Sequence, residues 1–283
     1  MEPLAHPPIG ARAAVAPPRA ARARKSRWPA KLDLAQSVSG LLLGLFMWGH
    51  MFFVSTILIS EDAMWTVTKF FEGHFFFGRP YPIIVSFVVA AVFALFVVHA
   101  ALALRKFPIN YGQYRTYRDH MATMRHEDTT LWYWQVVTGF ALFFLASVHL
   151  YQMMMHPAQI GPWSSADRVW SGLWWPLYLV LLFAVELHGG IGLYRLAVKW
   201  GWLAGDDDRA TRRRLKKVKW ALSIFFIVLG LATLGAYIKI GMGREARIGK
   251  DFVPSWQQTT TLPAWLTKPS PPPPTTTGSE GRK

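Results

Sequence analysis

The sequence predicts an all-α protein, an integral membrane bundle of five transmembrane helices, and three observations support this fold class. Of the 283 residues 52% are hydrophobic, and 14 are Trp. A helix needs roughly 20 apolar residues to cross about 30 Å of hydrocarbon. Five stretches of that length contain no Asp, Glu, Lys or Arg apart from Glu186: residues 34–60, 80–104, 129–166, 169–194 and 220–238. Because a bilayer core offers no partners to charged side chains, each stretch predicts one spanning helix.

The first helix is expected at 34–59, at the start of a five-helix domain that covers 33–243. Residues 1–32 are rich in Ala, Pro and Arg with one acid, Glu2, so we expect a disordered basic tail there. A secretory signal would follow its short apolar run with a small-residue cleavage site. Here the apolar run continues without interruption to His50, which favours a helix that remains in the membrane.

The second helix is expected at 82–104, and an aromatic segment separates it from the first. Aromatic rings favour the headgroup level of a membrane, so this segment is predicted to lie at the interface. Its rings are Trp65, Phe70, Phe71, Phe75, Phe76, Phe77 and Tyr81. Glu72 and His74 lie among these rings, and we expect both at the outer aqueous margin.

Three further helices are expected, at 131–155, 170–198 and 220–238. A polar loop, 105–128, precedes the third helix, and a short loop with Pro157 and Pro162 precedes the fourth. Beyond the fifth helix we expect an extended Pro/Thr-rich tail over 244–283, because consecutive prolines and a Thr run do not pack into a core.

Basic residues predict the orientation of the helices. The N-terminal tail and the loops after the second and fourth helices carry 20 Lys and Arg residues, against 10 in the other two loops and the C-terminal tail. Because basic loops stay in the cytoplasm, the N-terminus is expected in the cytoplasm and the C-terminus outside it. These loops also account for the net charge of +15, so we expect no nucleic acid partner.

The absence of cysteine restricts the cofactors that the chain can hold. It excludes disulfides, thiolate-bound iron–sulfur clusters and haem attached through a Cys-x-x-Cys-His motif. Any bound cofactor is therefore held by His, Met or carboxylate side chains.

Four of the nine histidines lie inside predicted helices, one in each of the first four: His50, His99, His149 and His188. At about 1.5 Å per residue, His50 and His149 are roughly 24 and 27 Å from the cytoplasmic starts of their helices, and so near the outer side. The other two lie nearer the cytoplasm by the same count. The four imidazoles sort by depth into two pairs on antiparallel helices, as two bis-histidine haems b stacked across a bilayer require.

Other interpretations of these residues stay open. Histidines inside a membrane also bond to neighbouring helices or relay protons. Met47, Met51 and Met153 are alternative ligands in principle, although Met more often fills gaps in a core. Glycines beside the histidines would let a flat macrocycle lie close to the backbone: Gly44, Gly49, Gly139, Gly189, Gly190 and Gly192.

Haem propionates need hydrogen-bond donors at the two membrane faces. Candidates at the cytoplasmic level are Gln36, Ser37, Trp132 and Lys199, and the candidate at the outer level is Arg168. Each also has an ordinary explanation as a helix cap or an interfacial anchor, and spacing alone does not decide between them.

Together these features resemble a known family. Five spans, a histidine on each of the first four, and the segments FFEGHFFFG and VELHGGIGLYR resemble the dihaem cytochrome b subunit of menaquinol:fumarate reductase, one of the succinate:quinone oxidoreductases. The resemblance covers about residues 33–243. It implies an anchor in a bacterial inner membrane that passes electrons from menaquinol to two cytoplasmic subunits, one with iron–sulfur clusters and one with FAD that reduces fumarate. A dimer of such heterotrimers is compatible with it.

The resemblance also implies roles for individual residues. It makes His50 and His149 the ligands of the distal haem, and His99 and His188 those of the proximal haem. It assigns Gln36, Ser37, Trp132 and Lys199 to the proximal propionates and Arg168 to the distal ones. Glu72 matches an acid essential for menaquinol oxidation, and Glu186 matches a transmembrane proton route.

Elementary chemistry is consistent with both acids. Quinol oxidation releases two protons with two electrons, so a carboxylate within reach of the quinol hydroxyl is the expected acceptor. A solvated loop acid is the alternative for Glu72. Glu186 precedes His188 by two residues, so at about 100° per residue it points to another side of the helix. It is a proton stop or a buried acid held neutral by a neighbour.

Three alternatives for the whole chain stay open. The same subunit can work in reverse, in a succinate dehydrogenase that reduces menaquinone. A helical bundle with His-ligated haem also serves as the cytochrome b subunit of a hydrogenase or a formate dehydrogenase. From a different class, the chain could be a haem-free membrane anchor.

Overall fold

The computed structural model describes residues 26–108, 110–124, 127–244 and 248–258, and helices are the regular structure in these residues. Five helices are long and apolar enough to cross a membrane, which confirms the predicted fold class. They are α1 (Trp28–Val54), α4 (Ile83–Leu104), α6 (Glu127–Met155), α8 (Trp175–Trp200) and α9 (Asp208–Met242). A short 3₁₀ helix, η1 (Ser55–Leu58), continues α1.

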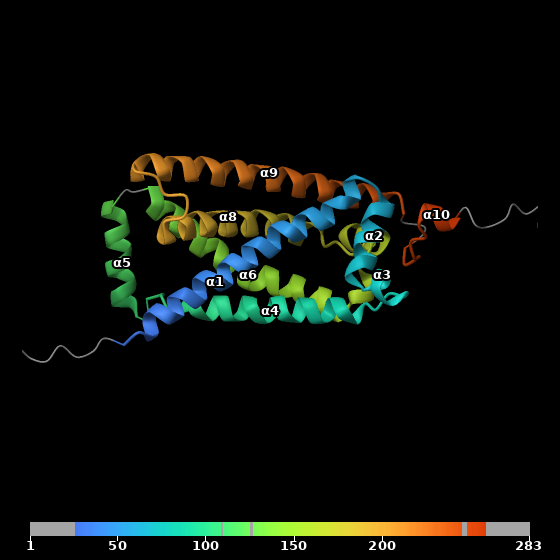
Figure 1. Ribbon diagram of the computed structural model, residues 1–283, viewed down its shortest axis with the longest axis horizontal. Helices are drawn as coiled ribbons and strands as arrows, with labels where there is room; N and C mark the ends of the chain where they lie inside the picture. The colour runs from blue at the N-terminus through green and yellow to red at the C-terminus, as the bar shows by residue number, and fades with distance from the viewer. Residues whose placement is uncertain (1–25, 109, 125–126, 245–247, 259–283) are drawn as a thin grey trace, which may run out of the picture.

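The five long helices alternate in direction along the chain (Figure 1). α5 (Tyr111–Met124) lies across one end of the bundle, and α2 (Glu61–Phe71), α3 (His74–Phe77) and α10 (Ser255–Gln258) lie at the other. We call these the α5 end and the α2 end. α8 packs against α6, α9 and α1, while α4 packs against α1 and α6. The helices α1, α4, α6 and α8 therefore surround a shared interior.

The predicted start of the fourth span, at residue 170, is wrong. A separate helix at the α2 end, α7 (Pro162–Trp170), ends there, after a 3₁₀ turn, η2 (Pro157–Gln159), and α8 begins only at Trp175. The chain turns at Leu173, whose φ of 56° lies in the left-handed region. Pro176 then stands in the first turn of α8, where proline is tolerated. Because this turn contains no charged residue, a pattern of missing charges does not reveal it.

Two other segments were expected to be loops, but they are helical although they lie outside the apolar stretches. The polar loop expected at 105–128 contains α5, a surface helix whose composition conceals it. α9 begins at Asp208 and not near residue 220. The Asp207 carboxylate accepts a hydrogen bond from the amide of Arg209 at 2.8 Å and caps this extension. Lys and Arg are good helix formers, so the basic segment continues the helix beyond the membrane.

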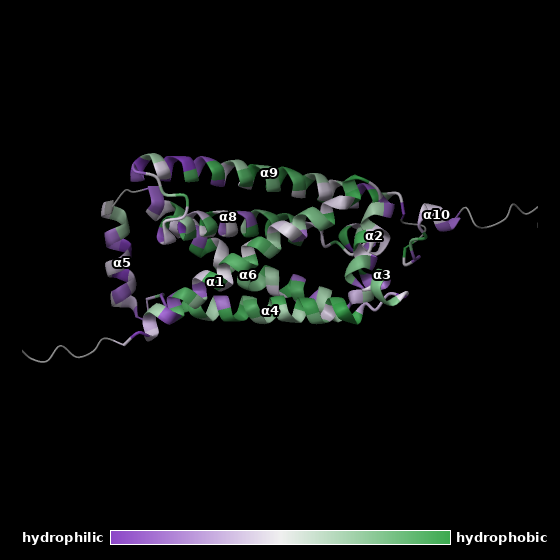
Figure 2. Ribbon diagram, in the orientation of Figure 1, coloured by the Kyte–Doolittle hydropathy of each residue, from purple (hydrophilic) through white to green (hydrophobic). Residues whose placement is uncertain are grey.

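Apolar residues cover the middle of the bundle, and polar residues gather at its two ends (Figure 2). Large apolar side chains are exposed on the outer faces, among them Phe87 at 71%, Phe144 at 68% and Val228 at 60%. In a bilayer such faces contact lipid. On its inner face α9 keeps one buried stripe at helical spacing: Leu215, Lys219, Ser223, Phe226, Gly230, Thr233, Tyr237 and Gly241.

Charged side chains connect the helices at the α5 end. Asp33 on α1 accepts hydrogen bonds from Lys106 and from Lys199, which lies in the last turn of α8. Lys216 on α9 pairs with Glu127 at 2.7 Å and with Asp128 at 3.0 Å, both in the first turn of α6. Such contacts add little stability when exposed, but they set how the helix ends are aligned.

Residues 248–258 pack against the α2 end, so this part of the expected C-terminal tail is not unpacked. The Ser255 hydroxyl donates to Asp62 at 2.6 Å, and the rings of Trp256 and Trp65 meet edge to face at 5.6 Å. The aromatic residues of this segment supply apolar area that the Pro/Thr-rich part lacks.

Most residues of the two expected tails lie outside the part of the chain that the structure describes. The expected disorder of 1–25 and the extended run over 259–283 lie outside the described residues. Of the expected N-terminal tail, the last residues belong to α1, which begins at Trp28 with Pro29 in its first turn.

Candidate functional site

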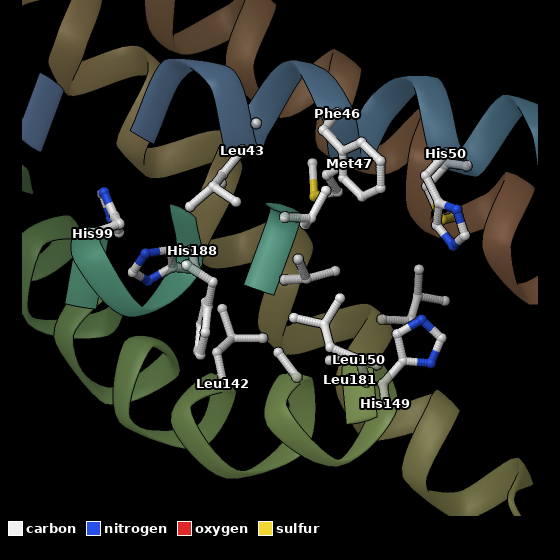
Figure 3. A pocket seen from close by; sticks show the side chains of 18 of the residues that line it. Leu43, Phe46, Met47, His50, His99, Leu142, His149, Leu150, Leu181 and His188 are labelled. Carbon is white, nitrogen blue, oxygen red and sulfur yellow. The ribbon is translucent and has the colours of Figure 1, made fainter. Parts of the chain in front are cut away.

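A cavity of about 1460 Å³ occupies the interior of the bundle. Its wall is formed mainly by α1, α4, α6 and α8, with contributions from α2, α7 and α9. All four intramembrane histidines line it. Figure 3 shows His99 and His188 facing each other at one end, His50 and His149 facing each other at the other, and apolar side chains such as Met47 between the two pairs.

The distance between the ring centres is similar in the two pairs. The rings of His50 and His149 are 6.1 Å apart, and those of His99 and His188 are 6.4 Å apart. The pairing by depth therefore agrees with the geometry. The expectation of antiparallel partners is wrong, since α1 and α6 run the same way, as do α4 and α8. Every second helix of an alternating bundle has the same direction.

The pair at the α5 end is oriented by hydrogen bonds. Nδ1 of His188 lies 2.9 Å from the carbonyl oxygen of Gln135, and Nδ1 of His99 lies 3.1 Å from the hydroxyl of Ser39. That hydroxyl has the carbonyl of Gln36 to donate to, at 3.1 Å, so we assign it as the acceptor from His99. Both imidazoles then carry their proton on Nδ1, which leaves Nε2 free as a ligand.

At the α2 end, contacts with aromatic rings orient the histidine pair. Phe46 stacks on His50 with 5.8 Å between ring centres, and Tyr178 meets His149 edge to face at 5.5 Å. Among the described residues Nδ1 of His149 has no hydrogen-bond partner although it is buried. The two pairs therefore differ in their polar surroundings.

Several glycines leave room beside the histidines. A Cβ on Gly139 would lie 3.0 Å from Cε1 of His188, and one on Gly40, which the sequence analysis did not single out, would lie 2.9 Å from Cε1 of His99. Of the glycines singled out from the sequence, these line the cavity: Gly44, Gly49, Gly139, Gly189 and Gly192. Gly190 does not, because it faces Ser223 on α9.

The polar residues predicted for the α5 end all line the cavity: Gln36, Ser37, Trp132 and Lys199. The ammonium group of Lys199 donates to the Ser37 hydroxyl at 3.1 Å. The buried Oε1 of Gln36 has no hydrogen-bond partner within the described part of the chain. Trp132 packs edge to face against Tyr117 at 5.0 Å, where partial burial raises the pKa of the Tyr117 hydroxyl and keeps it neutral.

Arg168 lines the cavity near the α2 end, from the last turn of α7. Its guanidinium donates to the carbonyl of Gln159 at 3.0 Å and to the hydroxyl of Ser165 at 3.2 Å. Its buried Nε has no partner among the described residues. The protein therefore orients the guanidinium of Arg168 through two hydrogen bonds, and its Nε–H group makes no bond to the described residues.

Glu72 lies at the α2 end of the bundle, but its side chain is fully buried at the end of α2 and does not contact water. One carboxylate oxygen accepts a hydrogen bond from Lys69 at 2.6 Å, and the other has no partner in the described residues. Glu72 itself is not part of the cavity wall, but Thr68 and Phe71, which precede it on the same helix, are. A solvated loop acid is thereby excluded for this residue.

Glu186 is also fully buried, and it is not part of the cavity wall either, whereas His188 is. The two side chains leave α8 on different sides, as their spacing predicts. Neither carboxylate oxygen has a hydrogen-bond partner among the described residues. The structure therefore keeps this acid apart from the histidine pairs.

The residues around the cavity have the geometry that two bis-histidine haems need. Imidazoles on opposite sides of one metal bring their ring centres about 6 Å apart, since each metal–nitrogen bond is about 2 Å and each ring nitrogen lies about 1 Å from its ring centre. Both observed pairs match this spacing. The cavity, at about 1460 Å³, exceeds the roughly 300–1,000 Å³ that is typical for one small ligand.

Fold and site together define a helical membrane protein of the cytochrome b class. Residues 112–230 match the family of succinate dehydrogenase/fumarate reductase transmembrane subunits. The fumarate reductase cytochrome b subunit of Wolinella succinogenes is 63% identical over 219 residues, which cover 77% of this chain and 86% of that relative. The subunits of the same name from two strains of Helicobacter pylori are 56% identical over 219 residues, or 77% of this chain and 84% of theirs. The chain belongs to this family of membrane subunits.

Proposed function

We propose that this chain is the dihaem, quinone-reactive membrane subunit of a fumarate reductase. The observation that carries the proposal is the presence of two facing histidine pairs at different depths of one cavity. His50 and His149 would hold one haem b, and His99 and His188 the other. Bound haem iron supplies one-electron redox chemistry, which the chain's own side chains lack.

The polar residues at the two ends of the cavity would bind the haem propionates. Lys199, Ser37, Gln36 and Trp132 serve the haem at the α5 end, and Arg168 serves the one at the α2 end. Support comes from Gln36 and Arg168, which line the cavity and whose Oε1 and Nε are buried without a hydrogen-bond partner among the described residues. Such contacts orient a macrocycle and offset the charge of its carboxylates.

Glu72 would accept the protons that menaquinol releases when it is oxidised. It lies at the α2 end, directly after cavity residues of α2, and one of its oxygens is buried without a partner. Lys69 contacts one oxygen of this carboxylate at 2.6 Å, so the other oxygen is the one left for a proton donor. Glu186 would carry protons through the membrane, since a buried acid inside a span is costly to keep without a function.

The proposal includes an orientation and partners. The α5 end would face the cytoplasm of a bacterium, as the distribution of basic residues predicts, and the α2 end the periplasm. An iron–sulfur subunit and an FAD-containing subunit would dock at the α5 end, and two such heterotrimers would form a dimer. Support comes from the names of the relatives, which are subunits of fumarate reductase.

The reverse reaction is the second candidate, because the matching family includes succinate dehydrogenases. Membranes that contain the complex would be assayed for succinate oxidation with and without an uncoupler. Loss of succinate oxidation on uncoupling would identify an enzyme that works uphill toward menaquinone. A hydrogenase or formate dehydrogenase role has no support from the relatives.

Purification of the tagged chain with its partners, followed by quantification of haem and flavin, tests the proposed function. We expect two haems b and one FAD for each copy of the chain, with a reducible Soret band. One haem or none would overturn the dihaem assignment and would make a haem-free anchor the better description. A nickel or molybdenum partner without a flavoprotein would overturn the assignment to fumarate reductase.

A further inference from the structure

One face of α9 continues from lipid-facing residues to a pair of basic residues. α9 lies along the edge of the bundle (Figure 1), and Ile224 and Val228 are 59% and 60% exposed there. At about 100° per residue, Arg213, Lys217 and Trp220 lie on the same side of the helix, within an arc of about 80°. The buried stripe of α9 lies on roughly the opposite side. We call these five residues the outer face of α9.

Trp220 marks the level at which this face leaves the hydrocarbon. It is 43% exposed, it begins the charge-free part of α9, and tryptophan favours the headgroup level of a membrane. At 1.5 Å per residue, Lys217 lies about 4.5 Å and Arg213 about 10 Å beyond it. A headgroup layer is roughly 5–8 Å thick, and a long basic side chain can extend back toward it. Both basic groups therefore reach the level of the lipid phosphates.

The basic residues of this part of α9 differ in whether they have partners. Arg212 and Lys216, which lie nearer the bundle, pair with Asp128 at 3.2 Å and 3.0 Å. Arg213 and Lys217 are exposed, and neither makes an ion pair or a hydrogen bond within the described part of the chain. The outer face thus presents two cationic groups that are available to an anion from outside the bundle.

The surroundings of the outer face add positive charge and no acid. Lys219 is only 5% exposed, and its Nζ lies 2.8 Å from the centre of the Trp220 ring, a cation–π contact that helps to orient the indole. Residues 209–244 contain no Asp or Glu. Asp208, just before them, lies about 140° from Arg213 around the helix axis. An anion at Arg213 and Lys217 would therefore meet no acidic side chain of α9.

An anionic phospholipid matches both parts of this face. Its acyl chains require an apolar surface such as that of Ile224 and Val228, and its phosphate requires cationic donors at headgroup level. A soluble protein that docks across the α5 end would cover the end of the bundle. It would not cover a side whose next turns lie in hydrocarbon. Charge complementarity and continuity with the lipid-facing surface together favour the lipid.

We infer that the outer face of α9 is a binding site for an anionic phospholipid. Arg213 and Lys217 bind the headgroup phosphate, Trp220 lies at the boundary of the hydrocarbon, and an acyl chain follows Ile224 and Val228. The inference goes beyond the proposed function, because it involves neither haem nor quinol. A Lys or Arg near a lipid surface contributes about 1 kcal/mol, which corresponds to about a fivefold change in affinity.

The test measures lipid binding to the purified intact complex. The complex in detergent is titrated with phosphatidylglycerol and, separately, with phosphatidylcholine, and bound lipids are counted by native mass spectrometry. We expect tighter binding of phosphatidylglycerol. Arg213→Gln combined with Lys217→Gln should weaken the tightest phosphatidylglycerol site about 30-fold, and each single substitution about fivefold. Added salt should weaken binding to the wild type, since the contacts are electrostatic.

Two controls separate a specific site from net charge. Arg115→Gln combined with Arg118→Gln removes the same charge from the same end of the bundle, but from exposed side chains of α5. This variant should bind phosphatidylglycerol like wild type. Arg213→Lys keeps the charge on the outer face and should bind close to wild type. An equal loss in the α5 variant would assign the effect to net charge and overturn the site.

Three further outcomes would overturn the inference. One is equal affinity of the wild-type complex for phosphatidylglycerol and phosphatidylcholine. Another is wild-type binding of phosphatidylglycerol in the variant that lacks both charges. The third is release of the other subunits from that variant while its lipid binding stays unchanged, which would make the outer face a docking surface for protein. If the double variant failed to assemble, Arg213→Gln and Lys217→Gln alone would still decide.

Discussion

Ser39 offers the sharpest test of how the protein orients His99, one of the proposed haem ligands. Its hydroxyl is 3.1 Å from Nδ1 of His99, and Ser39 is only 3% exposed. Ser39→Ala would remove the hydroxyl that accepts from the partly buried N–H of His99, and such a loss costs about 1–3 kcal/mol. Taken as about 2 kcal/mol, the loss corresponds to roughly a 30-fold weaker hold on the haem at the α5 end. This value agrees with the usual effect of such substitutions: removal of the hydrogen-bond partner of a metal-bound histidine typically lowers the affinity for the metal roughly 10–100-fold.

The assay is the retention of haem during purification, followed by a redox titration of the two haems. We expect Ser39→Ala to lose one haem preferentially and to raise its midpoint potential, because a less basic imidazole stabilises ferric iron less. Ser39→Thr keeps a hydroxyl and should behave like wild type. Ser86→Ala is the control, since it removes a partly buried donor, 2.7 Å from the carbonyl of Met154, for which no hydrogen bond to a histidine is found among the described residues. Full haem content and unchanged potentials in Ser39→Ala would refute this reasoning.

Three further predictions follow from the same geometry. His188→Ala should remove one of the two haem spectra and leave the other; retention of both would show that His188 is not a ligand. Glu72→Gln should keep both haems and lower quinol oxidation by about 10²–10⁴-fold, the usual contribution of a general base; normal turnover would exclude it as the acceptor. Gly241→Ala should lower the stability of the complex by about 1–3 kcal/mol in a thermal melt, because its Cβ would lie 2.8 Å from the carbonyl oxygen of Ala166. Gly235→Ala, with nothing within 4 Å, is its control and should melt at or above the wild-type temperature.

The spans and the histidine pairs could be predicted because each depends only on how far a residue lies along its helix, and that distance follows from a count of residues. Missing charges locate the apolar core, and the count of residues from a helix end gives the depth of His50 or His188. The rotation of each helix about its axis does not follow from such a count. For this reason Gly190 was expected beside the haem but faces Ser223, and Ser39 was not expected beside His99.

The surroundings of Glu72 could not be predicted for a related reason. Its neighbours in sequence are aromatic, and a short segment between two spans has no periodicity that indicates which side is covered. In the structure α2 ends at Glu72 and packs under other elements of the α2 end, including η1 and α7. Burial of this acid is therefore a tertiary effect, as is the packing of residues 248–258 over α2.

The proposed function gives α8 two tasks, haem ligation by His188 and proton transfer by Glu186, and the two side chains lie on different faces of the helix. His188 faces the cavity, whereas Glu186 and Gly190 face α9, and the body of the helix lies between them. A carboxylate next to a haem would shift its charge balance at every electron transfer, because unit charges a few ångström apart interact strongly at low dielectric. Placing the acid on the opposite face weakens this coupling while both groups stay within one turn of the same helix. In the proposed arrangement a further helix has to cover the acid, and α9 lies against this face of α8 with its buried stripe.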